Sequence, residues 1–189
     1  MLTIFALAHF HFARYLDTLF QSSVDSDDRM EHLIQAINHY GAALNLGVKH
    51  LFQSLPRLLT MWLEFTSLGD KDAKSAGHDG ESLHRELSVS HHLMPFYVAC
   101  LQENQDRLNK IMKRFASSIP AHMFYTALPQ LVSSILHPDA ESRRNVSLIL
   151  RTVLVNYPAH SLWSIGWLRQ SKNEDKSKAG SVSTAYCSQ

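Results

Sequence analysis

Apolar residues recur at steps of three and four along most of this chain, and this spacing restricts the fold more than any other feature of the sequence. Such steps place apolar side chains on one face of an α-helix, whereas a half-buried strand needs strict alternation. The pattern is clearest from Arg29 to Gln53, and no segment has a convincing strand pattern. We therefore expect an all-α protein. The apolar positions of that stretch are Met30, Leu33, Ile34, Ile37, Tyr40, Leu44, Val48, Leu51 and Phe52.

Prolines and polar residues divide the rest of the chain into further helices. Pro56 is placed to open a helix, since proline is tolerated in the first helical turn. The stretch from Leu101 to Phe115 is amphipathic. From Pro120 to Leu136 we predict a helix that Pro129 kinks, because proline lacks the N–H that a helix needs there. Asp139 follows a short turn and is placed to cap the next helix.

Two more helices are expected near the ends of the chain. Before Ser22, five apolar residues share one helical face, and Pro158 opens a last helix. Gly41 and Gly47 lie inside the pattern from Arg29 to Gln53, where each costs about 1 kcal/mol relative to alanine. Close packing of a neighbouring helix is one reason to keep a glycine at such positions. The five residues of the first face are Leu2, Phe5, Phe12, Leu16 and Leu19.

The order of a kinked helix, a tight turn with Asp139 and an apolar second helix resembles a HEAT repeat. Such helix pairs cannot bury their apolar faces alone, so they stack on one another. We expect residues 1–170 to form a helical-repeat solenoid, HEAT- or TPR-like, of antiparallel helix pairs. A flexible loop is expected at about 67–80, which is rich in Gly, Asp, Lys and Ser, and a disordered tail at 171–189.

Charge and composition argue against several partners. The net charge of +1 argues against a strongly electrostatic partner such as a DNA backbone, although it does not exclude a local basic patch. No apolar run reaches the length of about 20 residues that spans a bilayer. Cys100 and Cys187 form no disulfide framework, and the 12 histidines show no metal-binding spacing. We therefore expect no metal, no direct contact with nucleic acid and no membrane.

Two sequence elements follow one another from Tyr40 to Phe65. The first is YGAALNLG at 40–47 and the second is QSLPRLLTMWLEF at 53–65. Together they resemble the segment of ATR-type kinases in which a YGxAL element precedes a QSxPRxLTxWL element. Weaker similarities follow at 120–137 and 153–163. The chain is thus similar, from Arg29 to Leu168 apart from the loop, to the FAT domain of ATR-type phosphatidylinositol-3-kinase-related serine/threonine-protein kinases.

The resemblance implies helical repeats that wrap a kinase domain. It also implies a nuclear kinase that modifies Ser or Thr followed by Gln, together with an obligate partner that recruits it to coated single-stranded DNA. ATP and Mg would be bound by the kinase domain of the parent protein. This chain has no glycine-rich ATP loop, no Asp-Phe-Gly element and no catalytic loop, so we assign it no cofactor and no catalytic residue. We expect a non-catalytic scaffold fragment whose partners are that kinase domain and a regulatory protein.

Three residues are candidates for a scaffold or interaction role. Arg57 could form an ion pair with a kinase lobe, or its aliphatic part could pack on an aromatic face. Trp62 and Trp163 could contact a partner, although aromatic residues at helical spacing usually pack in a core.

Two other kinds of protein stay open at this stage. A free-standing helical-repeat adaptor would bind a partner in a groove and have complete caps, whereas a scaffold segment would expose apolar faces at both ends. An enzyme in its own right is the third reading, but no GxSxG elbow or other catalytic motif supports it.

Overall fold

The computed structural model describes residues 2–23, 26–67 and 94–162, and these contain helices and no strand. The all-α expectation is therefore confirmed for the described part of the chain. Most helices are long enough to bury a continuous apolar stripe. In chain order they are α1 (Leu2–Ser22), α2 (Ser26–Leu46), α3 (Leu51–Thr66), α5 (Met94–Ser118), α6 (Ala121–Thr126), α7 (Leu128–Ser133) and α8 (Ala140–Asn156).

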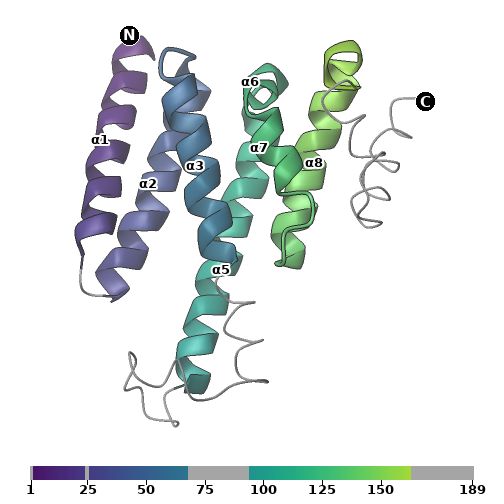
Figure 1. Ribbon diagram of the computed structural model, residues 1–189. Coiled ribbons are helices and arrows are strands. Elements are labelled where there is room, and N and C mark those ends of the chain that lie inside the picture. The colour runs from purple at the N-terminus through teal and green to yellow at the C-terminus, as the bar shows by residue number, and fades with distance from the viewer. Residues whose placement is uncertain (1, 24–25, 68–93, 163–189) are drawn as a thin grey trace.

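The helices lie side by side in one array that runs from α1 at one edge to α8 at the other (Figure 1). α1 packs along α2, α2 contacts α3 and α5, and α8 contacts α5, α6 and α7. This is the helical-repeat solenoid of stacked helix pairs that the sequence predicts. The largest fully buried side chains lie where helices face each other: Trp62, Phe124, Leu33, Ile37, Leu44, Leu55, Leu58, Leu59, Leu108, Met112, Leu128 and Leu131.

The helical pattern from Arg29 to Gln53 is divided between two helices. α2 ends at Leu46, a turn follows, and α3 begins at Leu51. Val48 and Phe52 are consequently exposed, although the spacing predicts them to be buried. The reason is that apolar steps of three and four continue by chance across the turn, which spacing alone cannot distinguish from a helix.

Pro56 lies inside α3 and does not open it, which corrects the predicted start of this helix. Because proline has no N–H, the carbonyl four residues earlier lacks its helical hydrogen bond. In a helix interior this costs about 3 kcal/mol or more. The buried stripe of Leu55, Leu58 and Leu59 offsets this cost. The carbonyl of Pro56 itself accepts a hydrogen bond from Gln130 Nε2 at 3.2 Å.

The kink predicted at Pro129 is confirmed and amounts to a break. α6 ends at Thr126, Ala127 leaves the helical conformation with φ −105° and ψ 15°, and α7 begins at Leu128. Pro129 stands in the first turn of α7, where its missing N–H does no harm. The cap predicted at Asp139 is also confirmed, because its side chain accepts a hydrogen bond from the backbone N–H of Ser142.

The first helix buries a different face from the predicted one. Its buried positions include Ala6, Phe10, Ala13 and Leu16. Of the five residues predicted to pack, Leu16 is buried and Leu19 partly so, whereas Leu2, Phe5 and Phe12 are exposed. The small side chains of Ala6 and Ala13 let α1 approach α2 closely, and packing depends on shape as well as on hydropathy.

The two glycines of the first pattern differ. Gly41 on α2 faces the ring of Phe115 on α5, and a Cβ at Gly41 would overlap that ring. The prediction of close packing is thus confirmed there. Gly47 follows the end of α2, and a Cβ there would meet only Ala6 Cβ at 4.0 Å, an ordinary contact. Close packing therefore does not account for Gly47.

Several predictions fall outside the described residues. These are most of the loop at 67–80, the tail at 171–189 and the last helix beyond residue 162, which includes Trp163. Residues 158–162 are helical, as the predicted helix start requires. None of the helices within the described ranges combines the length and apolarity of a membrane-spanning segment.

Candidate functional site

A buried side chain of α5, Asn109, joins three parts of the array. Its Oδ1 accepts hydrogen bonds from Trp62 Nε1 on α3 and from Ser142 Oγ on α8, both at 2.9 Å. Its Nδ2 donates to Asp139 Oδ2, at the start of α8, at 3.0 Å. Asn109 is 3% exposed, so water does not compete for these bonds. We call Trp62, Asn109, Asp139, Ser142 and Asn145 the Asn109 junction.

The remaining contacts of the Asn109 junction involve the backbone. Asn145 Nδ2 donates to the carbonyl of Asn109 at 3.1 Å, across the interface of α5 and α8. Asp139 Oδ2 accepts from the N–H of Ser142 at 2.7 Å and so caps α8. Each bond satisfies a buried polar group that would otherwise cost about 1–3 kcal/mol. The junction therefore fixes the relative positions of α3, α5 and α8.

His137 ties the turn before α8 to the end of α3. Its Nδ1 accepts from the backbone N–H of Asp139 at 3.2 Å, which leaves the ring proton on Nε2. Nε2 lies 2.9 Å from the carbonyl of Leu63 and donates to it. Arg143 on α8 also contacts this turn, because its Nη1 donates to the carbonyl of His137 at 3.2 Å.

The electrostatics of the Asn109 junction favour an ionised Asp139. Burial would raise the pKa of this carboxyl, but the hydrogen bonds from Ser142 and Asn109 outweigh burial and hold the pKa below its ordinary value. A carboxylate at the first turn also interacts favourably with the positive end of α8.

A second polar cluster lies between α1 and α3. Arg57 donates from Nε to Asp17 Oδ2 at 2.7 Å and from Nη2 to Asp17 Oδ1 at 2.6 Å. Gln21 Nε2 donates to Asp17 Oδ1 at 3.1 Å, and the Tyr40 hydroxyl lies 3.4 Å from Oδ2. We call these four residues the Asp17 clamp. It connects α1, α2 and α3, which are the first three helices of the array.

The Asp17 clamp shifts the pKa of its members. Burial raises the pKa of Asp17, but the hydrogen bonds of Arg57 and Gln21 and the positive charge of Arg57 hold it below its ordinary value. Burial and the charge of Asp17 raise the pKa of Tyr40 to about 12. At neutral pH the clamp thus contains one carboxylate, one guanidinium and one neutral phenol, with charges that balance.

Neither cluster is arranged for catalysis. Their polar atoms saturate one another, and no nucleophile with an adjacent base faces an open cavity in either of them. Within the described ranges, no three His, Cys, Asp or Glu side chains are grouped so as to hold a metal ion. The chemistry that these residues can perform is to hold helices together.

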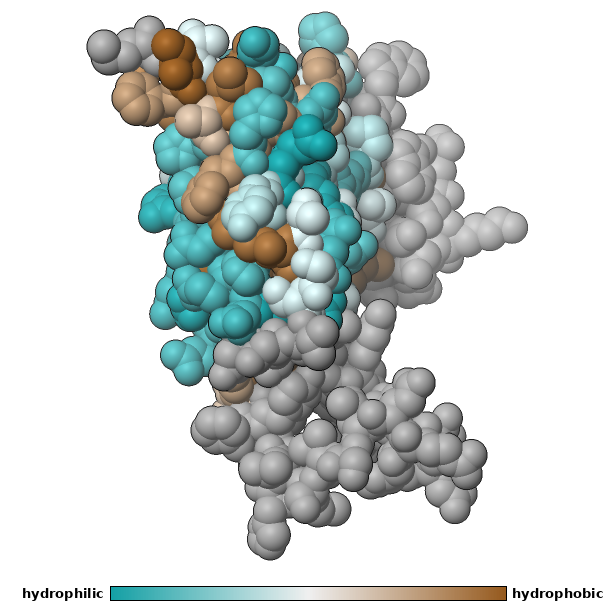
Figure 2. All heavy atoms as spheres, turned by 90° about the vertical axis from the view of Figure 1, so that its left-hand side faces the viewer, coloured by the Kyte–Doolittle hydropathy of each residue, from teal (hydrophilic) through white to brown (hydrophobic). Residues whose placement is uncertain are grey.

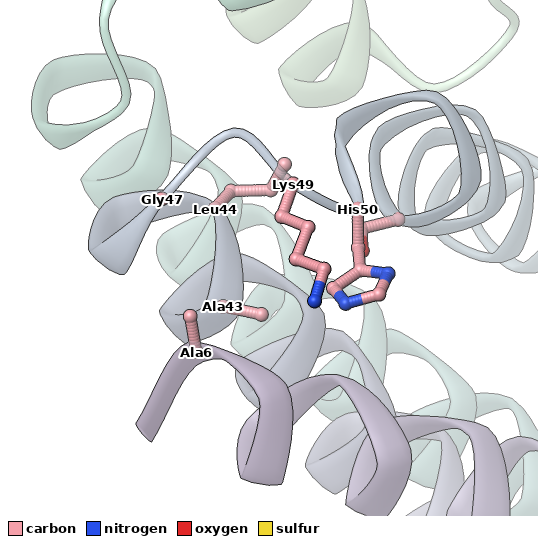
Figure 3. Close-up of a pocket in the computed structure, with 7 residues that line it drawn as sticks. Ala6, Ala43, Leu44, Gly47, Lys49 and His50 are labelled. Carbon is pink, nitrogen blue, oxygen red and sulfur yellow. The ribbon is translucent and has the colours of Figure 1, made fainter. Parts of the chain in front are cut away.

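The small cavity in Figure 3 supports the same conclusion. It lies between α1, the end of α2 and the start of α3, with Ala6, Lys49 and His50 among its lining residues. Its volume of about 10 Å³ is room for one water molecule and not for a nucleotide. His50 Nε2 and Ser54 Oγ are buried here without a hydrogen-bond partner.

The structure gives the three candidate residues different places. Arg57 is engaged by Asp17 within the chain, and its contact with a kinase lobe stays a prediction. Trp62 is fully buried and belongs to the Asn109 junction, which agrees with packing in the core and not with contact to a partner. Trp163 lies outside the described residues.

Reasoning from the sequence missed the residues that these candidates bind. Asp17 and Asn109 were not singled out, yet each stands on the buried face of its helix. Asp17 follows Ala13 by four residues, and Asn109 follows Leu108 directly. A polar residue at an apolar-face position was the available signal, because such a residue needs a buried partner.

Comparison with known proteins shows consistent similarity. Residues 107–187 match the family described as "Serine/threonine-protein kinase ATR-like, HEAT repeats". Protein kinase rad3 of Schizosaccharomyces pombe is 28% identical over 150 residues, which is 79% of this chain and 6% of rad3. Serine/threonine-protein kinase ATR of Arabidopsis thaliana is 30% identical over 188 residues, which is 86% of this chain and 6% of the relative.

Serine/threonine-protein kinase MEC1 of Candida albicans is 27% identical over 182 residues, which is 96% of this chain and 7% of the relative. The chain therefore spans only a small part of the length of the curated relatives that it matches. No solved structure matches the chain.

Proposed function

Because this chain is homologous over most of its length to ATR-like serine/threonine-protein kinases and matches their HEAT repeats, we propose that it is a non-catalytic scaffold segment of such a kinase. In this role it supports a kinase domain in DNA-damage and replication-stress checkpoint signalling. The names of the relatives describe kinases, and the described part of this chain is built of helices that pack on one another.

The similarity to ATR-like kinases carries the proposal, and the Asn109 junction supports the scaffold role within it. A scaffold must keep its helices in one arrangement when a partner binds. A buried hydrogen-bond network whose polar groups are all satisfied specifies one such arrangement. Asn109 links Trp62 on α3 with Asp139 and Ser142 around the start of α8. A partner that moves one of these helices moves the others with it, and so shifts the kinase domain between conformations.

The assignment to the FAT type of helical repeat is part of the proposal. The YGxAL element lies on α2, and the QSxPRxLTxWL element lies on α3, so the two elements pack against each other. Several of their residues have structural tasks: Tyr40 and Arg57 belong to the Asp17 clamp, and Trp62 belongs to the Asn109 junction. We propose a nuclear protein whose partners are the kinase domain and a regulatory protein.

Exposed apolar residues support a segment of a longer array over a capped adaptor. Ile4 and Phe5 on α1, and Leu148 and Val155 on α8, are exposed. These two helices lie at opposite edges of the described array (Figure 1). Capping repeats have a polar outer face. A free-standing adaptor is therefore the weaker alternative.

The proposal is tested by adding the purified 189-residue chain to the kinase domain of the Arabidopsis relative and measuring heat of binding by calorimetry. We expect saturable binding, and no transfer of phosphate from ATP to a Ser-Gln peptide by the chain alone. A chain that fails to bind the kinase domain contradicts the support role. Turnover by the chain alone, surviving rigorous purification, contradicts the non-catalytic role.

A further inference from the structure

The outer face of α1 carries a stripe of exposed apolar side chains. Ile4 is 71% exposed, Phe5 53%, Phe12 47% and Tyr15 58%. With 3.6 residues per turn these four positions share the side of the helix that points away from the buried Ala6, Phe10 and Ala13. Figure 2 looks at the α1 edge and shows apolar side chains at its upper end and in a patch at its middle, among hydrophilic ones. Exposed apolar surface of this kind marks an interaction site.

One border of the stripe is a polar groove between α1, α2 and α5. His9 and His39 lie in it with their Nδ1 atoms 2.7 Å apart, and the ring of Phe12 meets that of His39 edge to face. The groove has a volume of about 490 Å³, and its other polar lining residues are Gln35, Asn38, Asn45, Arg114 and Ser118. Arg114 is exposed and is held in place by Asn38 Oδ1, which accepts from its Nη2 at 2.9 Å.

The opposite border of the stripe also offers hydrogen-bond donors. His11 and Arg14 are exposed there, and Arg14 lies over the ring of Phe10 at 5.8 Å. The only carboxylate on α1 is Asp17, which is buried in the Asp17 clamp. No carboxylate lines the groove. Donors and cations therefore flank the stripe on both sides, although the chain as a whole has a net charge of only +1.

We propose that the outer face of α1 binds an amphipathic helix whose apolar stripe covers Ile4, Phe5, Phe12 and Tyr15 and whose flanks carry carboxylates. Carboxylates on one flank reach His9 and Arg114 in the groove, and those on the other reach His11 and Arg14. Apolar contact supplies the affinity, and the matched charges fix orientation and exclude basic helices. The exposed face of α1 also supports the longer array proposed above, but the test below involves no kinase domain, so the two proposals can fail separately.

Two synthetic peptides of about 20 residues test this inference with the full chain. Both carry the same leucine stripe, but one is flanked by Glu and the other by Lys. Fluorescence anisotropy should show that the Glu peptide binds about tenfold more tightly than the Lys peptide. In the chain, Phe12→Ser should weaken binding of the Glu peptide by about tenfold, and Arg114→Glu should abolish the preference for it.

The matched control is Val155→Ser, which removes an exposed apolar side chain from α8 at the other edge of the array and should leave binding unchanged. Circular dichroism establishes that each variant is folded, and Tyr15→Ser replaces Phe12→Ser if the latter is not. The inference is overturned by equal affinity for both peptides, by no binding of either, or by binding that neither Phe12→Ser nor Arg114→Glu changes. Self-association of the chain that Phe12→Ser abolishes also overturns it, because a second copy then occupies the face.

Discussion

Arg57 on α3 and Asp17 on α1 form a two-point ion pair across the first three helices, with N–O distances of 2.7 and 2.6 Å. The two residues are 40 positions apart in the sequence. Asp17 is largely buried, whereas about a third of the Arg57 side chain is exposed. The pair therefore resembles a partly buried salt bridge, which is worth more than a surface pair and is harmful when one partner is removed.

Asp17→Ala should destabilise the chain by about 2 kcal/mol, because it leaves Arg57 and the Tyr40 hydroxyl without their acceptor. Arg57→Lys should also destabilise it, since a lysine cannot donate two hydrogen bonds in the same plane. Urea unfolding measures both effects. The control is Glu141→Ala, which breaks the exposed pair with Arg144 and should cost less than about 0.5 kcal/mol. Equal losses for Asp17→Ala and Glu141→Ala would contradict a structural role of the clamp.

Asn109→Leu should destabilise the chain by about 2–4 kcal/mol. The substitution keeps the branching of the side chain at Cγ but leaves Trp62 Nε1 and Ser142 Oγ buried without an acceptor. Urea unfolding again supplies the measurement. Asn45→Ala removes an exposed hydrogen bond to Ser118 and should change stability by less than about 0.5 kcal/mol. If Asn109→Leu proves as harmless as that control, the junction does not hold the array.

Gly41→Ala should destabilise the chain by about 1–2 kcal/mol, because overlap with the buried Phe115 ring outweighs the better helix propensity of alanine. Gly47→Ala, which meets no close neighbour, should be neutral or slightly stabilising. Thermal unfolding of both variants tests the difference. Phe115→Leu should reduce the penalty of Gly41→Ala in the double variant, and additive losses would show that the ring is not its cause.

Stability should fall as the pH drops from about 7.5 to about 5.5. Burial, and then the charge of neighbouring His9, lower the pKa of His39 below its ordinary value of 6.5. The folded chain thus favours a neutral His39, so this contribution is complete above pH 6.5 and decreases as the pH falls through the folded-state pKa. His39→Gln should flatten the fall in melting temperature over this range. A melting temperature that does not decrease in the native chain contradicts the argument.

The Asn109 junction shows why the sequence predicts helices better than it predicts contacts between helices. Helices and their buried faces follow from local spacing, and α5, the break at Pro129 and the cap at Asp139 agree with it. The partners of Trp62 and Arg57 are 47 and 40 positions away in the sequence, and no periodicity relates residues so far apart. Only the packing of helix on helix brings them together.

The errors have physical causes as well. The sequence predicts one continuous helical pattern through the turn at Val48, because the three- and four-residue apolar spacing of α2 happens to continue into α3. Hydropathy predicts that the larger apolar residues of α1 are buried. In the structure Ala6 and Ala13 are buried instead, because their small side chains allow close contact with α2. The stripe containing Phe5 and Phe12 was left exposed for the same reason, and it became the surface on which a partner helix is proposed.

The most direct test of the scaffold role replaces the matching segment of Arabidopsis ATR by this chain and measures phosphotransfer to a Ser-Gln peptide. The account predicts an active chimera whose activity falls about tenfold with Asn109→Leu and is unchanged with Asn45→Ala. An inactive chimera, or one whose activity ignores Asn109→Leu, would contradict a support role carried by the junction between α3, α5 and α8.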